Sequence, residues 1–117
     1  MKKLEQLGMK IRDFAMKYPE THEDFPWGER AIKVKAKAFV FMRFDEKEVS
    51  FSVKLPQSRD LALDTGFGEP THYGLGKHGW VTIKITSKTK IPFDVLSRWI
   101  DESYRAVAPK TLVKTLG

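Results

Sequence analysis

The stretch YGLGKHGWVTIK, from Tyr73 to Lys84, spaces three glycines as in the G-x-G-x-x-G motif of nucleotide-binding loops. In dinucleotide-binding folds a helix follows this motif, because the pyrophosphate rests on the N-terminus of that helix. Here WVTIKI follows, and its alternation of apolar and polar residues predicts a strand. The kinase version lies between strands, but its lysine motif follows on the next strand, whereas VTIK overlaps the loop, and the chain contains neither H-R-D nor D-F-G. We therefore predict that the glycines permit tight turns with positive φ and bind no nucleotide.

The same loop carries His72, Tyr73 and His78, residue types that bind metals or transfer protons. Two histidines supply two ligands, whereas a closed zinc site needs four, and the chain has no cysteine. No serine or threonine lies in a nucleophile-elbow pattern. We therefore expect no metal, no cofactor and no catalytic residue, and we predict that the protein is not an enzyme.

The elements that position this loop follow from the spacing of apolar residues. Between residues 4 and 18 apolar residues recur every three or four positions, which predicts an amphipathic helix that Pro19 ends. Alternation predicts strands in RAIKVKA, EVSFSVKL and WVTIKI, and AFVFMRF, apolar on both sides, predicts a central strand. SRDLALDT predicts a short helix, and Pro92 begins a second long helix. The acidic and aromatic segment 20–28 is expected to connect the first helix to the sheet.

Together these elements predict one domain over residues 1–117, of class α+β, in the order α-β-β-β-α-β-α. Helices are expected on one face of an antiparallel sheet. The predicted core comprises Leu7, Ile11, Phe14, Val34, Val53, Ile83, Leu96 and Ile100.

The composition narrows the cellular setting. The chain has 117 residues, 41% of them hydrophobic, which is enough for one globular domain with a real core. No apolar run is long enough to span a membrane, and an amphipathic rather than apolar segment follows the first three residues. We therefore expect a cytoplasmic protein without a signal peptide or membrane contact. The sequence does not predict an oligomeric state.

The net charge of +6 favours a polyanionic partner, and DNA is the partner that we predict. Strand alternation places basic residues on the face away from the helices, together with the aromatic residues Phe39 and Phe41. The predicted nucleic-acid site comprises Lys33, Lys35, Arg43, Lys54, Lys77, Trp80 and Lys84.

Two alternatives remain open at this stage. The lysine stems can cover the rings of an ordinary solvated sheet face. The protein can also be a non-enzymatic module that binds a protein or a small anionic ligand through the loop from Phe67 to Trp80. A basic stripe across the sheet would favour nucleic acid, and an enclosed pocket under the loop would favour a ligand.

Four segments resemble the MmcQ/YjbR family: DFPWG, AFVFMRF, the loop that ends at Trp80, and IDESYRAVAPK near the C-terminus. The resemblance runs from the first helix to about Leu112, and DESY followed by VAPK is its most specific part. It implies a frataxin-like (CyaY-like) fold of two helices on an antiparallel sheet, described in that family as a double-wing DNA-binding fold. It implies no established reaction or cofactor.

The chain departs from the family pattern at two places. Many members have a histidine directly before the loop tryptophan, but here Gly79 separates His78 from Trp80, so a role for that histidine does not carry over. Many members also begin the middle helix with Asp-Pro, where this chain has Leu55-Pro56 and lacks a helix cap. Frataxin-like iron binding would need carboxylates grouped on the first helix, which carries two among five basic residues, so we expect no iron.

Overall fold

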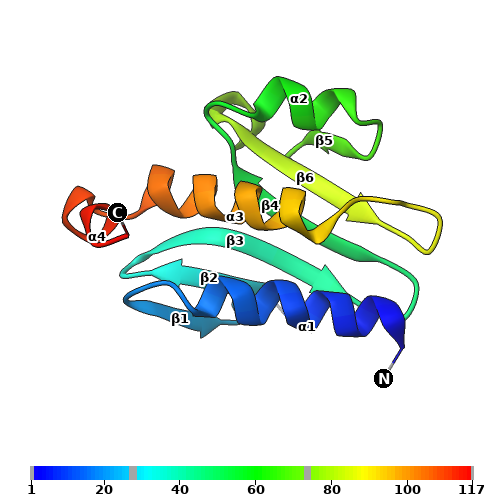
Figure 1. Ribbon diagram of the computed structural model, residues 1–117, viewed down its shortest axis with the longest axis horizontal. Helices are drawn as coiled ribbons and strands as arrows, with labels where there is room; N and C mark the ends of the chain where they lie inside the picture. Colours follow the sequence, from blue (N-terminus) through cyan, green and yellow to red (C-terminus); the bar gives the residue numbers. More distant parts are fainter. Residues whose placement is uncertain (1, 27–28, 73–74, 117) are drawn as a thin grey trace.

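Six antiparallel strands form one sheet in the order β1-β2-β3-β4-β6-β5 (Figure 1). The computed structural model describes residues 2–26, 29–72 and 75–116. The strands are β1 (Thr21–Asp24), β2 (Arg30–Val34), β3 (Lys37–Phe44), β4 (Val49–Lys54), β5 (Gly68–Pro70) and β6 (Trp80–Ile85). The helices are α1 (Lys3–Met16), α2 (Arg59–Asp64), α3 (Phe93–Val107) and α4 (Lys110–Lys114), with a 3-10 helix, η2 (Leu75–His78), before β6.

The long helices α1 and α3 lie side by side across one face of the sheet, and α2 packs against its β5–β6 end (Figure 1). The α+β class with helices on one face of an antiparallel sheet is therefore confirmed. The predicted order is incomplete, because the structure adds the edge strands β1 and β5 and the C-terminal helix α4. THED has no apolar alternation and GEP contains both glycine and proline, so these strands depend on pairing with β2 and β6 rather than on their own residues.

The predicted core is confirmed for most of its members. Ile11, Val34, Val53, Ile83, Leu96 and Ile100 are each at most 1% exposed and belong to one cluster. Leu7 and Phe14 are half-buried and pack against that cluster from α1. The core therefore lies between the sheet and the helices, as the helical and strand periodicities predict.

Phe39 contradicts the prediction that it lies on the open face, the face of the sheet away from α1 and α3. Ile32 pairs with Val40 and Lys33 pairs with Ala38, so Phe39 is an extra residue in β3, a β-bulge. The bulge shifts the alternation of side chains and turns Phe39 into the core, where it is fully buried. Its ring centroid lies 5.1 Å from that of Tyr104.

The end of α3 ties this bulge to the neighbouring strand. The Ser103 hydroxyl donates to the Phe39 carbonyl at 2.5 Å and accepts from the Lys54 backbone N–H at 2.8 Å. It therefore bridges β3 and β4 where their direct pairing ends, beyond Val40 and Val53. The neighbouring Tyr104 donates its hydroxyl to the carbonyl of residue 19, at 2.8 Å.

The two acidic residues before them are also engaged in the fold. Asp101 accepts a hydrogen bond from the Tyr18 hydroxyl at 2.6 Å and one from Arg105 at 2.7 Å. Burial, together with that bond to Asp101, raises the pKa of Tyr18 above its ordinary range. Glu102 accepts from the backbone N–H groups of residues 57 and 58, at 2.9 and 3.0 Å, and from the Ser58 hydroxyl at 2.6 Å. It thus supplies, from α3, a cap for the start of α2.

Candidate ligand-binding site on the open face

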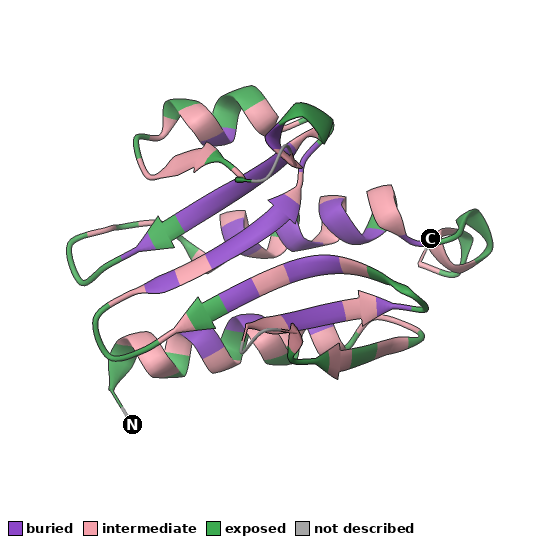
Figure 2. Ribbon diagram, turned by 180° about the vertical axis from the view of Figure 1, so that it is seen from behind, coloured by how far each residue is buried: buried purple, intermediate pink, exposed green. Residues whose placement is uncertain are grey.

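The open face of the sheet carries side chains in rows across neighbouring strands, and Figure 2 views the molecule from this side. The pairing of β3, β4 and β6 puts Arg43, Ser50 and Lys84 in one row. Phe41, Ser52 and Thr82 form the next row, and Lys54 lies beside Trp80 in the row after that. Successive rows are about 7 Å apart along the strands.

A hollow of about 440 Å³ lies over the first two rows. Its floor consists of side chains of β3, β4 and β6. One wall contains Pro26 and Glu29, and the other is the segment from β5 to η2, which contributes Glu69, Thr71, His72 and Leu75. The volume lies in the range of sites that hold small molecules.

Three hydroxyl groups in this hollow form a chain. The Ser52 and Thr82 oxygens lie 2.7 Å apart, and the Thr82 and Thr71 oxygens lie 3.0 Å apart. Each hydroxyl has one hydrogen to donate, so the two contacts use two of the three hydrogens. The third hydrogen is donated to no other described residue. The chain can therefore donate one hydrogen bond to a bound molecule.

Charged groups lie at the edges of the hollow in two arrangements. Lys84 Nζ is 3.1 Å from Glu69 Oε1, so this cation is already paired. Arg43 is exposed, and Glu29, the residue directly before β2, lines the same hollow. Within residues 2–26, 29–72 and 75–116, neither Arg43 nor Glu29 forms an ion pair.

The residues predicted to bind nucleic acid do not form one stripe. Arg43 and Lys84 line the hollow, whereas Lys33 pairs with Asp24 at 3.0 Å. Lys54 is half-buried in the third row, and the remaining two lysines lie outside the strands: Lys35 in the β2–β3 turn, with φ of 54°, and Lys77 exposed in η2.

Trp80 lies on the open face but is only 7% exposed. Its ring centroid is 5.4 Å from that of Phe41, at an interplanar angle of 49°. The two rings therefore pack against each other, which leaves little of the indole available for a stacked base.

The loop residues also separate. His72 lines the hollow, His78 is exposed at the end of η2, and Tyr73 lies outside the described residues, as do Gly74 and segment 27–28. Gly79 has φ of 88°, which confirms its predicted role in a tight turn before a strand. Gly76 serves another purpose, because a Cβ there would lie 2.9 Å from Pro70 Cβ.

The residue pattern did not predict a role for the hydroxyl residues of the hollow: Ser50, Ser52, Thr71 and Thr82. Ser50, Ser52 and Thr82 occupy the polar positions of strands in which apolar and polar residues alternate, and residues at such positions usually face solvent. A signal did exist, because two adjoining strands carry small hydroxyl residues rather than long charged ones at their middle positions.

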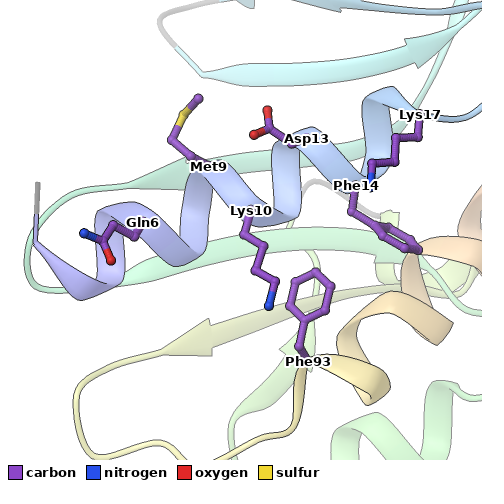
Figure 3. A pocket seen from close by; sticks show the side chains of 7 residues that line it. All are labelled: Gln6, Met9, Lys10, Asp13, Phe14, Lys17 and Phe93. Atoms are coloured by element: carbon purple, nitrogen blue, oxygen red, sulfur yellow. The ribbon is translucent and has the colours of Figure 1, made fainter.

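A second hollow, of about 470 Å³, lies on the helix side between α1 and the start of α3 (Figure 3). Lys10 reaches across it and places its Nζ 4.2 Å from the centroid of the Phe93 ring. Except for Phe93 and for Lys17, the residue directly after α1, its lining residues come from one helix, so it is a surface groove along α1. The hollow on the open face differs, because four strands and two loops contribute polar groups that converge.

Two further findings concern other kinds of site. Among the described residues, no group of three histidines or carboxylates is placed to hold a metal ion. In the same part of the chain, no helix is long and apolar enough to cross a membrane.

Comparison with known proteins identifies the family. The YjbR family model matches residues 16–106, most of the chain. The chain belongs to the YjbR family. No curated protein matches it. The crystal structure of a DUF1801-family protein from Bacillus subtilis is similar, with a TM-score of 0.57 and 13% identity over 87% of this chain and 79% of that one. At this identity the likeness shows the fold of the YjbR chain alone.

Proposed function

We propose that this YjbR protein is a non-enzymatic binding module that takes a small ligand with an anionic group into the hollow on its open face. The observation that carries the proposal is the convergence on one hollow of Arg43, which forms no ion pair with a described residue, of Lys84, which is paired with Glu69, and of spare hydroxyl donors. Ser50 lies between the two cations in the same row. Charge-assisted hydrogen bonds from such donors are the strong ones in anion recognition.

The test is a titration of ¹⁵N-labelled protein with a panel of small anions: inorganic phosphate, acetate, citrate and 3-phenylpropionate. We expect at least one to cause saturable shifts at Arg43, Ser50 and Lys84. Arg43→Met should remove that binding, whereas Arg98→Met, which removes an exposed cation from α3, should leave it unchanged. The absence of saturable shifts with every anion would overturn the proposal.

Nucleic-acid binding is the second candidate function, and the unpaired cations support it. Besides the net charge of +6, α1 carries Lys3 and Lys10, and Lys17 follows directly after it; all three are exposed and form no ion pair with a described residue. A spacing of seven residues puts them almost on one line, about 10 Å apart. The open face supports this candidate less well, because the carboxylates of Asp24 and Glu69 neutralise two of its lysines.

A salt-titrated DNA-binding assay tests this candidate and locates the surface. Each phosphate contact contributes about 0.9 to the slope of log affinity against log salt. If α1 binds, Lys10→Ala/Lys17→Ala should reduce the slope by roughly 1.8, and Lys35→Ala/Lys54→Ala should not. The opposite result would assign binding to the β2–β3 turn and the end of β4, where Lys35 and Lys54 lie, and no binding at low salt would remove the candidate.

We also infer that the fold is frataxin-like, as the family resemblance implies. The packing of α1 and α3 across one face of an antiparallel sheet supports this inference.

A further inference from the structure

Each of the two edges of the open-face hollow carries one basic and one acidic side chain, but only one edge has them joined in an ion pair. On the β6 side, Lys84 and Glu69 form a direct ion pair with Nζ and Oε1 3.1 Å apart. On the β3 side, Arg43 of β3 and Glu29, the residue directly before β2, both line the hollow, and neither forms an ion pair with a described residue. The hollow therefore offers both a cation and a carboxylate for a bound molecule.

The spacing of these two residues limits the ligand. Residues directly opposite each other in antiparallel strands have Cα atoms about 4.5–5.5 Å apart. Arg30 and Met42 are such a pair, and Glu29 and Arg43 are the next residues along their segments and line the same hollow, so their charged groups can reach two opposite charges of one bound molecule. A carboxylate and an ammonium on the same carbon atom meet this requirement.

The rest of the hollow fits the remainder of such a molecule. The ring of Phe41 lies one row from Arg43, and Leu75 and Pro26 face the same space from the two walls. These side chains provide an apolar surface beside the charged edge. The hydroxyl chain of Ser52, Thr82 and Thr71 adds one donor that can support an oxygen of the ligand.

We propose that the ligand is a zwitterionic α-amino acid with an apolar side chain, its carboxylate on Arg43 and its ammonium on Glu29. This inference rests on the proposed function of the hollow and names the class of ligand. The apolar side chain lies against Phe41 and Leu75. Since Lys84 is held by Glu69, it acts as a secondary contact for the carboxylate.

Three probes of one shape test the proposal by isothermal titration and chemical-shift mapping: L-phenylalanine, 3-phenylpropionate and 2-phenylethylamine. All three have a phenyl ring on a short carbon chain. L-phenylalanine carries both charges, 3-phenylpropionate only the negative charge, and 2-phenylethylamine only the positive charge. We expect L-phenylalanine to bind about tenfold more tightly than either analogue, the loss expected for one charge-assisted hydrogen bond. Glu29→Gln should abolish its advantage over 3-phenylpropionate.

Matched variants keep each outcome interpretable. Glu46→Gln makes the same change at an exposed glutamate of the β3–β4 turn and should leave all three affinities unchanged. Retained dispersion of the amide spectrum in each variant shows that the fold is intact. Equal affinity for L-phenylalanine and 3-phenylpropionate, with dependence on Arg43, would overturn the zwitterion and leave the anion site standing. The absence of binding by all three probes and by the simple anions would overturn both.

Discussion

The C-terminal half of α3 and the hollow on the open face use their polar side chains in opposite ways. From Asp101 to Tyr104, each side chain is hydrogen-bonded to a residue outside α3. In the hollow, a guanidinium, a carboxylate and two hydroxyl hydrogens, that of Ser50 and one of the chain of three hydroxyls, have no partner among the described residues. DESY is the most specific part of the family resemblance, yet its side chains are committed to structure. A motif that identifies a family can therefore consist of side chains that are fully used by the fold and are not free to bind a ligand.

The largest expected effect concerns Ser103, and it would sharpen this comparison. Ser103→Ala should lower the free energy of unfolding by about 2–4 kcal/mol, because the Phe39 carbonyl and the Lys54 N–H each lose a buried partner. Urea denaturation measures the loss, and ligand affinity of the folded variant should not change. Ser97→Ala on the same helix, where the hydroxyl bonds only within α3, should cost less than about 0.5 kcal/mol. A loss below about 1 kcal/mol at Ser103 would contradict the bridge between β3 and β4.

Glu102 should have the next largest effect. Glu102→Ala should lower the free energy of unfolding by about 1–2 kcal/mol, as loss of a helix cap does. The N–H groups of residues 57 and 58 and the Ser58 hydroxyl, just before α2, would lose their hydrogen-bond acceptor. Hydrogen exchange should accelerate at residues 57–62 more than elsewhere. Asp60→Ala, at an exposed position of α2 itself, serves as the control. Unchanged exchange in α2 would show that Glu102 is not its cap.

A smaller and pH-dependent effect is expected at Glu23, which connects β1 to α1. The hydrogen bond from Arg12 holds the pKa of Glu23 below its ordinary value, and a bond from Arg30 adds to this. A carboxyl with a lower pKa in the folded chain stabilises the fold above its unfolded pKa, and this contribution disappears as the pH falls through the folded pKa. Glu23→Gln should therefore lower the free energy of unfolding by about 1 kcal/mol at pH 7 and by less at pH 3. Urea denaturation at the two pH values measures both losses. An equal cost at both pH values would contradict this, and Glu46→Gln controls for the change in net charge.

The smallest effect on stability is expected at Arg43, where the largest effect on binding is also expected. Arg43→Met should change the free energy of unfolding by less than about 0.5 kcal/mol, because the side chain is exposed and forms no ion pair with a described residue. The same variant should weaken binding of an anionic ligand at least about tenfold. A destabilisation above about 1 kcal/mol would show that Arg43 belongs to the fold, and the contrast with α3 would fail.

The fold follows from the sequence wherever one residue type repeats with the period of its element. The apolar spacing in α1 and the alternation in β4 and β6 were sufficient to predict which faces are buried. The edge strands β1 and β5 lack this signal, because an edge strand is half solvated and its pairing comes from the neighbour.

The candidate site could be predicted only in part. Arg43 and Lys84 were assigned to the open face correctly, because alternation fixes the side of the sheet on which a residue lies. Their neighbours were not predictable, since the partner of a side chain depends on strand order and register. Those two properties bring Glu69 to Lys84 and place Glu29 and Arg43 on the same hollow.

By itself the sequence determined the α+β class, the buried faces of the long elements and the positive net charge, because each depends on residue type and local spacing. Tertiary structure alone decided that a bulge turns Phe39 inward, that Lys33 and Lys84 are neutralised, and that the hydroxyls of residues 52, 71 and 82 meet. These features join segments far apart in the chain, and the free energy of a hydrogen bond or ion pair depends on distances that local periodicity does not encode.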